Sequence, residues 1–461
     1  MTKRAAFFLV IIVLWLLCSY LFYLRFPNNY LYPNFYAEDG MVFAQSILTN
    51  GIFHSLFTTF NGYYVWGIYL IEYVCFLVNG FLYGPTIVNL PRIFAVGSYL
   101  FLGGVSVLPV ILLRSYFKFV TLFLIVLADT FVPMPSTDFN VIGTIGNLKF
   151  AFAYIGLLLI FYRWTLTSES RKNYFVDAFL VICGFTNVTV YLFLPLMLIC
   201  DGIQPKRLFT LKNWKVGNAS LVSAVFLVIA LSFQLIEVKI HGIPKFPHYL
   251  DDPLQVFSLP EIFIGRTLLY PLIFWCYAKM RLLILLGLLI PLIAASTIWV
   301  RGRHLQICVA AAGASLGIVG LFLMNRTGLS LLFQHFTSSG PDNFFYAANL
   351  CAVISIAVII QEGFAGTKRY TYLLAVGILS ILLVTKLPST GSFSERNFMY
   401  EGVGNIYQNA AHACAIRDDS SHKAILAVYP LPIYHMTIDR ALICSDSDPS
   451  KVLTSIKVNK I

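Results

Sequence analysis

Long runs of apolar residues recur along this chain and constrain its fold more than any other feature. Each run holds about 18 residues or more, enough for a helix to cross a hydrocarbon core of roughly 30 Å. The runs continue to residue 386, and the whole chain is 58% hydrophobic but only 11% charged. Because roughly a quarter of the residues of a soluble domain are charged, the sequence predicts a polytopic membrane protein.

The first run, AAFFLVIIVLWLLCSYLFYL, follows Lys3 and Arg4. It is longer than the apolar core of a signal peptide and no small-residue cleavage site follows it, so we expect a retained helix. The net charge of +11 comes from basic residues that are spread over short loops. That distribution is typical of cytoplasmic loops and does not indicate a nucleic-acid partner.

Charge and span length together predict a topology. With a cytoplasmic N-terminus, five short basic loops lie inside and the C-terminus lies outside. The predicted fold class is an all-α polytopic membrane protein with about nine full transmembrane helices. These are expected at 5–25, 92–113, 116–132, 149–163, 217–237, 282–299, 306–324, 345–362 and 370–386.

Two further apolar segments do not fit that count. The segment 64–84 is apolar enough to span, but a spanning helix there would invert the later basic loops. We therefore expect an interfacial or partly embedded helix, with its Tyr and Trp residues at the headgroups. The segment 174–200 begins and ends beside basic clusters and is too short for two full helices. A re-entrant hairpin or a pair of short helices is expected there, buried in protein.

The unusual polar residues are concentrated outside, whereas the cytoplasmic loops are short and merely basic. This asymmetry favours a protein that works on one face of the membrane over a channel or an alternating-access carrier, and no inverted repeat is visible. Two domains are expected, a transmembrane domain at 1–386 and an external lobe at 387–461. The long external loops are expected at 26–91, 133–148, 238–281 and 325–344.

The tail predicts a small α+β lobe. YEGVGNIYQNAAHACAI is typical of a helix, and KAILAVYP and MTIDRALICSD are typical of strands. On the oxidising face, Cys414 and Cys444 are candidates for a disulfide that closes a loop of about 30 residues. Two buried thiols are the alternative. The other cysteines have no spacing typical of a metal or redox site.

An acidic pair, Glu38 and Asp39, lies in the first external loop within FYAEDGMVFA. Aromatic neighbours that partly desolvate a carboxylate raise its pKa toward that of a useful general base. The alternative is structural, with Asp39 as the cap of a loop helix whose apolar face is MVFAQSIL. The residues alone leave both interpretations open.

Other polar residues near the external surface are candidates too. Asp129 lies within an apolar span, where a charge is costly and indicates function by default, although a hydrogen bond to a neighbouring helix also explains it. Asp138 suits a turn as well as a binding site. A divalent cation near His248, Asp251 and Asp252 stays open, because no established ligand spacing is matched there and no metal ligand is assigned.

Basic residues at the external helix ends either snorkel, with the charged group at the membrane interface, or bind a lipid phosphate. These residues are Arg92, Arg266, Lys279 and Arg281. Lys149 belongs to the mouth of the helix that follows the second external loop, two residues after Asn147.

A first helix, a long external loop with the acidic pair in YAEDG, then GYYVWGIYLIEYV and LPR before the next span, resembles the GT-C superfamily of polytopic glycosyltransferases. Within it, the chain is most similar to the bacterial and phage-borne serotype-converting O-antigen glucosyltransferases. The second external loop ending GNLKFAFAYIGLLLI, the stretch GFTNVTVYLFLPLML and the tail with AILAVYPLPIYHMTIDRAL extend the likeness along most of the chain. It is a likeness of layout and short motifs.

That resemblance implies a membrane hexosyltransferase. Such an enzyme passes a hexose, glucose in the nearest relatives, from a polyprenyl-phosphate donor to a lipid-linked glycan such as O-antigen, on the external face of the bacterial inner membrane. It implies no nucleotide sugar. Glu38 and Asp39 become the acid/base candidates, and the basic residues become phosphate ligands. The basic residues that the resemblance implies as phosphate ligands are Arg92, Lys149, His248, Arg266, Lys279 and Arg281.

One departure from the family leaves the second external loop without an assigned role. An aromatic residue usually stands beside the loop asparagine in that family, but this chain has NLKF with Lys149. Two other functions remain alternatives. One is an O-antigen polymerase or membrane acyltransferase, and the other is a non-enzymatic polyprenyl-lipid flippase or transporter.

Overall fold

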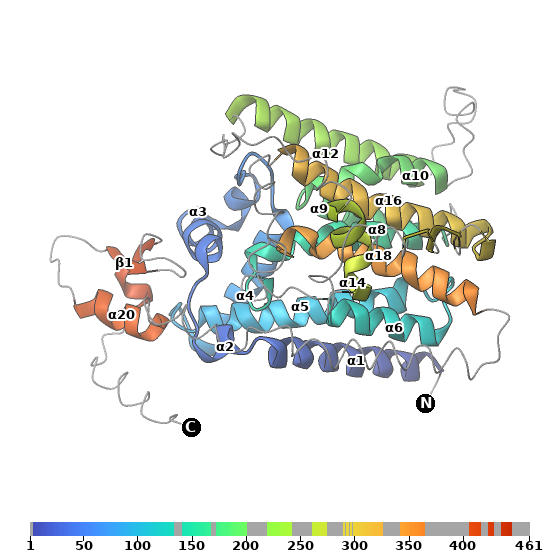
Figure 1. Ribbon diagram of the computed structural model, residues 1–461. Helices are drawn as coiled ribbons and strands as arrows, with labels where there is room; N and C mark the ends of the chain where they lie inside the picture. Colours follow the sequence, from blue (N-terminus) through green and yellow to red (C-terminus); the bar gives the residue numbers. More distant parts are fainter. Residues whose placement is uncertain are drawn as a thin grey trace.

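The computed structural model of the protein describes most of the transmembrane region and part of the tail. The described residues are 3–132, 141–166, 172–200, 219–241, 261–273, 289–325 apart from 291, 295 and 297, 342–364, 405–415, 423–427 and 435–444. They are mostly helical, and their long helices lie roughly side by side (Figure 1).

Within these residues, five helices are long and apolar enough to cross a membrane. They are α1 (Lys3–Arg25), α4 (Trp66–Tyr83), α5 (Leu90–Leu112), α16 (Gly302–Asn325) and α18 (Asp342–Gly363). Large apolar side chains such as Phe8 and Phe81 are exposed on the outer faces, as a lipid environment requires. The prediction of a helical membrane protein is confirmed at this level.

The nine full spans of the sequence analysis are not found among the described residues. The predicted spans 116–132 and 149–163 correspond to α6 (Phe119–Thr130) and α8 (Lys149–Arg163), which have 12 and 15 residues. A full span needs about 20 residues. Nearly every residue of α8 is buried, so contact with other helices replaces contact with lipid. The predicted span 370–386 and most of 282–299 lie outside the described residues.

Helix α4 occupies the segment 64–84, where an interfacial or partly embedded helix was expected. It is continuous over 18 residues and is apolar enough to span. Its inner face is buried, whereas Val74, Leu77 and Phe81 are exposed on the other side.

The segment 174–200 is broken, as predicted. Helix α9 (Lys172–Gly184) ends before a 3₁₀ turn, η3 (Val188–Phe193), and α10 (Leu194–Cys200) follows directly. Asn187 begins the turn, because its side chain accepts hydrogen bonds from the backbone N–H and the hydroxyl of Thr189 at 3.0 and 2.7 Å. Helix α12 (Ala219–His241) then packs against α9 and α10.

Of the elements in the loops and tail predicted to be external, α2, α3, α20 and β1 lie at the end of the molecule opposite the N-terminus (Figure 1). The first external loop forms α2 (Asn28–Leu31), the π-helix η1 (Asp39–Ala44) and α3 (Gln45–Leu56). The second forms the 3₁₀ turn η2 (Gly146–Leu148), which runs straight into α8. A second π-helix, η5 (Glu261–Leu269), and the short α14 (Tyr270–Ile273) pack against α18.

The tail contains the predicted α+β elements. Helix α20 (Ile406–Ala415) is followed by the antiparallel strands β1 (Lys423–Ala427) and β2 (His435–Asp439) and by the 3₁₀ turn η9 (Arg440–Leu442). Ile425 pairs with Thr437 at the centre of the register. Cys414 and Cys444 are joined by a disulfide, which is one of the two arrangements that the sequence left open.

The tail lobe docks on the first external loop. The backbone N–H of Ile406 donates to the carbonyl of Pro33 at 2.8 Å, and the N–H of Ile87 donates to Leu442 at 3.0 Å. Strand β2 also contacts η1. The tail is therefore part of the same assembly as the acidic loop.

Two adjacent glycines on α5 give a matched test of the packing of α1. A Cβ on Gly103 would lie 2.7 Å from the backbone nitrogen of Ser19, whereas a Cβ on Gly104 would meet only Trp15, at 3.6 Å. Gly103→Ala should cost about 1–3 kcal/mol of stability and lower the melting temperature in detergent. Gly104→Ala is the control and should melt like the parent. Equal melting temperatures for both variants would contradict this contact.

Candidate functional site

Asp39 is the buried centre of the contact between the two loops that the sequence predicts to be external. Its side chain is 2% exposed. One carboxylate oxygen accepts a hydrogen bond from the backbone N–H of Ile145 at 2.8 Å, and the other accepts from Gly146 at 2.7 Å. These N–H groups lie at the positive end of the η2–α8 segment, where an anion is stabilised. Asp39 thus anchors the second loop, which is a different contact from the cap on its own helix that the sequence suggested.

Gly146 is required at this contact. A Cβ added to it would lie 2.7 Å from the nearer carboxylate oxygen of Asp39 and 2.9 Å from the ring of Phe43. Only a residue without a side chain lets the backbone come this close to the carboxylate.

The pKa of Asp39 is raised to about 7, mainly because burial removes water from the carboxylate. The hydrogen bonds from Ile145 and Gly146 oppose that rise. The neighbouring negative charge of Glu38 raises the pKa further, and the positive charge of Lys149 lowers it. A second carboxylate and an ammonium group therefore act on Asp39 in opposite directions.

Glu38 has a different environment from Asp39. It is only half-buried, it does not cap η1 with its side chain, and within the described residues its carboxylate accepts no hydrogen bond. The two members of the acidic pair thus separate into an anchored carboxylate and an available one.

Lys149 is the first residue of α8 and is only 8% exposed. Its ammonium nitrogen lies 4.9 Å from the ring centroid of Phe60 and 5.6 Å from that of Phe150. Ring faces attract a cation but leave its N–H groups without a strong acceptor. Phe60 also packs edge-on against Phe43 of η1, with centroids 5.2 Å apart, which connects the lysine to the Asp39 helix.

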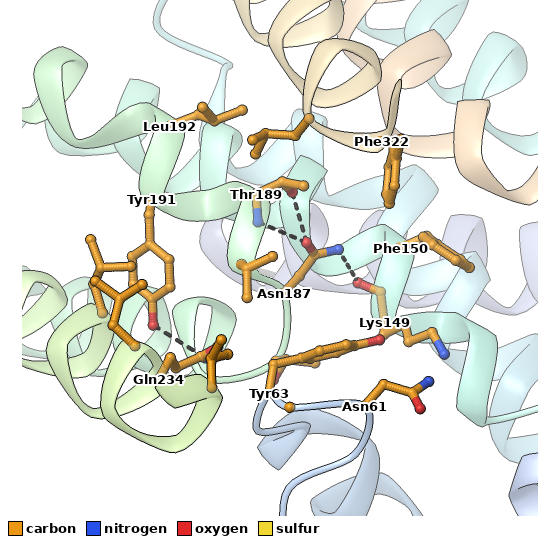
Figure 2. Close-up of a pocket in the computed structure, with 17 residues that line it drawn as sticks. Asn61, Tyr63, Lys149, Phe150, Asn187, Thr189, Tyr191, Leu192, Gln234 and Phe322 are labelled. Atoms are coloured by element: carbon orange, nitrogen blue, oxygen red, sulfur yellow. Dashed lines mark hydrogen bonds between the residues drawn. The ribbon is translucent and has the colours of Figure 1, made fainter. Parts of the chain in front are cut away.

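Lys149 lines a cavity of about 460 Å³ between the first loop, α8, η3, α12 and α16. Figure 2 shows Asn61, Tyr63 and Lys149 toward one end of the cavity, and Leu192 and Phe322 toward the other. Most of the wall is apolar. The apolar lining includes Phe150, Val188, Leu192, Leu231, Leu235, Val238, Leu321 and Phe322.

Asn187 fixes the polar wall of this cavity. Its amide nitrogen donates to the backbone carbonyl of Lys149 at 2.8 Å, while its amide oxygen is held by Thr189 (Figure 2). On the α12 side, the Gln234 amide donates to the hydroxyl of Tyr191 at 3.3 Å. The broken segment 174–200 thereby supplies a rigid polar edge to an otherwise apolar space.

The candidates Arg92, Arg266 and Asp129 do not line this cavity. Arg92 is half-buried between the rings of Tyr30 and Tyr407, at 5.8 and 5.2 Å, where the tail meets α5. Arg266 is 1% exposed and donates to the side-chain oxygen of Asn349 at 3.2 Å, so it joins η5 to α18.

Asp129 is buried too. It accepts a hydrogen bond from the hydroxyl of Tyr154 at 2.7 Å, the contact with a neighbouring helix that the sequence analysis gave as the alternative. The remaining candidates Asp138, His248, Lys279 and Arg281 lie outside the described residues.

The sequence analysis missed Glu72. This residue lies on the inner face of α4 and is fully buried, and it interacts electrostatically with Asp39. A carboxylate near the end of the apolar stretch GYYVWGIYLIEYV is the same kind of signal that singled out Asp129. It was passed over because the segment was expected at the interface, where a charge meets water.

The described residues contain no group of three His, Cys, Asp or Glu side chains placed to hold a metal ion. No protein-family model, curated protein or solved structure matches the chain. The function is therefore argued from the site itself.

The raised pKa of Asp39 predicts a pH-dependent stability. Between the ordinary value of 3.8 and about 7, the folded protein retains a proton that the unfolded chain has lost. Raising the pH across this window therefore lowers the free energy of unfolding that this group contributes. The amide in the Asp39→Asn variant does not titrate. The melting temperature of the parent minus that of Asp39→Asn should fall between about pH 4 and pH 7, measured at one scan rate. A difference that stays constant or grows would contradict the burial argument.

Proposed function

We propose that this protein is a membrane glycosyltransferase that moves a hexose from a polyprenyl-phosphate donor to a lipid-linked glycan on the external face of the membrane. The observation that carries the proposal is the mixed character of the Lys149 cavity. A lipid-phosphate donor has an apolar chain and an anionic head, and the cavity offers an apolar wall together with a buried ammonium group.

The phosphate end fits Lys149. An ammonium surrounded by ring faces keeps its hydrogen-bond donors for an incoming anion, and a phosphate is a strong multivalent acceptor. The leaving group of the reaction is a lipid phosphate, which departs as an anion and needs no acid. Lys149 would stabilise the negative charge that develops on it.

The acceptor end fits Glu38. A hydroxyl that attacks the anomeric carbon must lose its proton, and a positioned carboxylate contributes roughly 10²- to 10⁴-fold to such a step. Glu38 is half-buried and accepts no hydrogen bond within the described part of the chain, whereas both oxygens of Asp39 are occupied. We assign the base to Glu38 and the anchoring of the second loop to Asp39.

The layout supports the proposal as well. Helix α3 of the acidic loop and the elements α20 and β1 of the tail lobe lie at the same end of the long helices (Figure 1), and backbone hydrogen bonds join this loop to the tail. In more detail, we propose an enzyme similar to the GT-C glycosyltransferases, in the bacterial inner membrane with its C-terminus in the periplasm. A flippase needs a continuous path for a head group, and a carboxylate that acts as a base has no role in that process.

The proposal is tested by transfer of radiolabelled hexose from polyprenyl phosphate to a lipid-linked glycan in proteoliposomes. The parent protein should label the glycan without nucleotide sugar. A protein that moves the donor across the bilayer and labels no acceptor would favour the carrier alternative and contradict this function.

Two variants separate the two roles. Glu38→Gln keeps the shape of the side chain but removes the base, so transfer should fall by about 10²- to 10⁴-fold with donor binding retained. Lys149→Met keeps the length of the side chain but removes its charge, so its main effect should be a lower affinity for the donor. Glu362→Gln and Lys239→Met are the controls, because Glu362 pairs with His304 at 2.9 Å and Lys239 is exposed on α12. Near-parental transfer by Glu38→Gln would remove the catalytic assignment.

A further inference from the structure

Glu72 is the least satisfied polar side chain near the site. It is fully buried, and neither carboxylate oxygen has a hydrogen-bond partner within the described residues. An ionised carboxylate in such a place is strongly disfavoured, because water has been removed and nothing replaces it. A neutral carboxylic acid is far less costly to bury.

The contacts on either side place Glu72 behind η1. One turn before it on α4, the ring of Tyr69 packs edge-on against Phe43 of η1, with centroids 5.4 Å apart. One turn after it, the thiol of Cys75 lies 3.9 Å from the carbonyl oxygen of Ile93 on α5. The Glu72 carboxyl group therefore lies between η1 and α5, and Asp39 is the charged group that acts on it.

The two carboxyl groups have opposite surroundings. Asp39 receives two backbone N–H groups, whereas Glu72 receives none. Two neighbouring buried carboxyl groups do not ionise together, and the group with donors keeps the charge. Other titratable or charged groups that act on the pair are Glu38, Lys149, Tyr69 and Cys75.

We propose that Glu72 is a positioning residue that carries the single proton of a carboxyl pair with Asp39. Above about pH 7, where Asp39 has lost its own proton, the remaining proton stays on Glu72, and the negative charge on Asp39 anchors the segment from Ile145 to Lys149. When Glu72 releases its proton to solvent, a second buried negative charge arises and repels Asp39 from its two N–H donors. The pair thereby sets the range of pH in which Lys149 is held at the cavity.

Infrared difference spectroscopy of the purified full-length protein tests the pair without any substrate. A protonated carboxyl group has a carbonyl stretch that an ionised one lacks. At pH 8, the spectrum of the parent should contain a protonated-carboxyl band that is missing from Glu72→Gln. Glu362→Gln is the matched control and should retain the band.

Coupling is tested with Asp39→Asn. Removing the neighbouring charge should lower the pH at which the Glu72 band disappears by about one unit or more, a tenfold or larger change in proton binding. The inference is overturned if Glu72→Gln loses no band, or if the band of Asp39→Asn titrates at the same pH as that of the parent. The second comparison stands on its own if Glu72→Gln does not fold.

The consequence for activity rests on the proposed function and is measured separately. Glu72→Gln should retain sugar transfer at an alkaline pH at which the parent has lost it, since its amide cannot ionise. If the infrared result holds and no transfer is found in any variant, the carboxyl pair stands and the glycosyltransferase proposal fails. A parent and a Glu72→Gln variant with identical pH profiles would contradict the positioning role.

Discussion

Two backbone hydrogen bonds to Asp39 connect the two loops that the sequence predicts to be external. They join the first of these loops to the end of the second across more than a hundred residues of chain, and they fix where α8 begins. Lys149 is the first residue of that helix, so its ammonium group lies where the Asp39 contact places it. The tail lobe then packs against the same loop through Ile406 and Leu442.

The chemistry of the site follows from an unequal division of charge. Asp39 is held by donors and keeps its place, Glu38 is half-buried and available, and Lys149 is surrounded by aromatic rings. A cavity with an apolar wall adjoins the lysine. A lipid phosphate has complementary properties at both ends, because its chain gains from burial and its head gains from the cation.

The sequence predicted the features that depend on local pattern. The run of apolar residues in α1, the break between α9 and α10 and the strands around Ile425 and Thr437 were all predictable from periodicity and from helix-breaking residues. The number of full transmembrane spans could not be predicted in this way. Helix α8 has only 15 residues, and nearly all of them are enclosed by protein.

The site was only partly predictable for a similar reason. The pattern YAEDG singled out Glu38 and Asp39, but no local rule indicates that Asp39 binds N–H groups 106 and 107 residues away. Long-range contacts also explain Arg266 and Asp129. Inside the helical bundle, Arg266 is hydrogen-bonded to Asn349 and Asp129 to Tyr154. Glu72 was missed because its burial depends on η1 lying against α4.

The central claim is that the Lys149 cavity holds a lipid phosphate, and photocrosslinking tests it most directly. A polyprenyl phosphate with a photoreactive group near the head should label peptides of α12 and α16 that line the cavity, around Leu235 and Phe322. Unlabelled polyprenyl phosphate should compete, and a neutral polyprenol should compete much less. Labelling that is spread over the exposed faces of α1 and α4, and that both lipids suppress equally, would contradict the account.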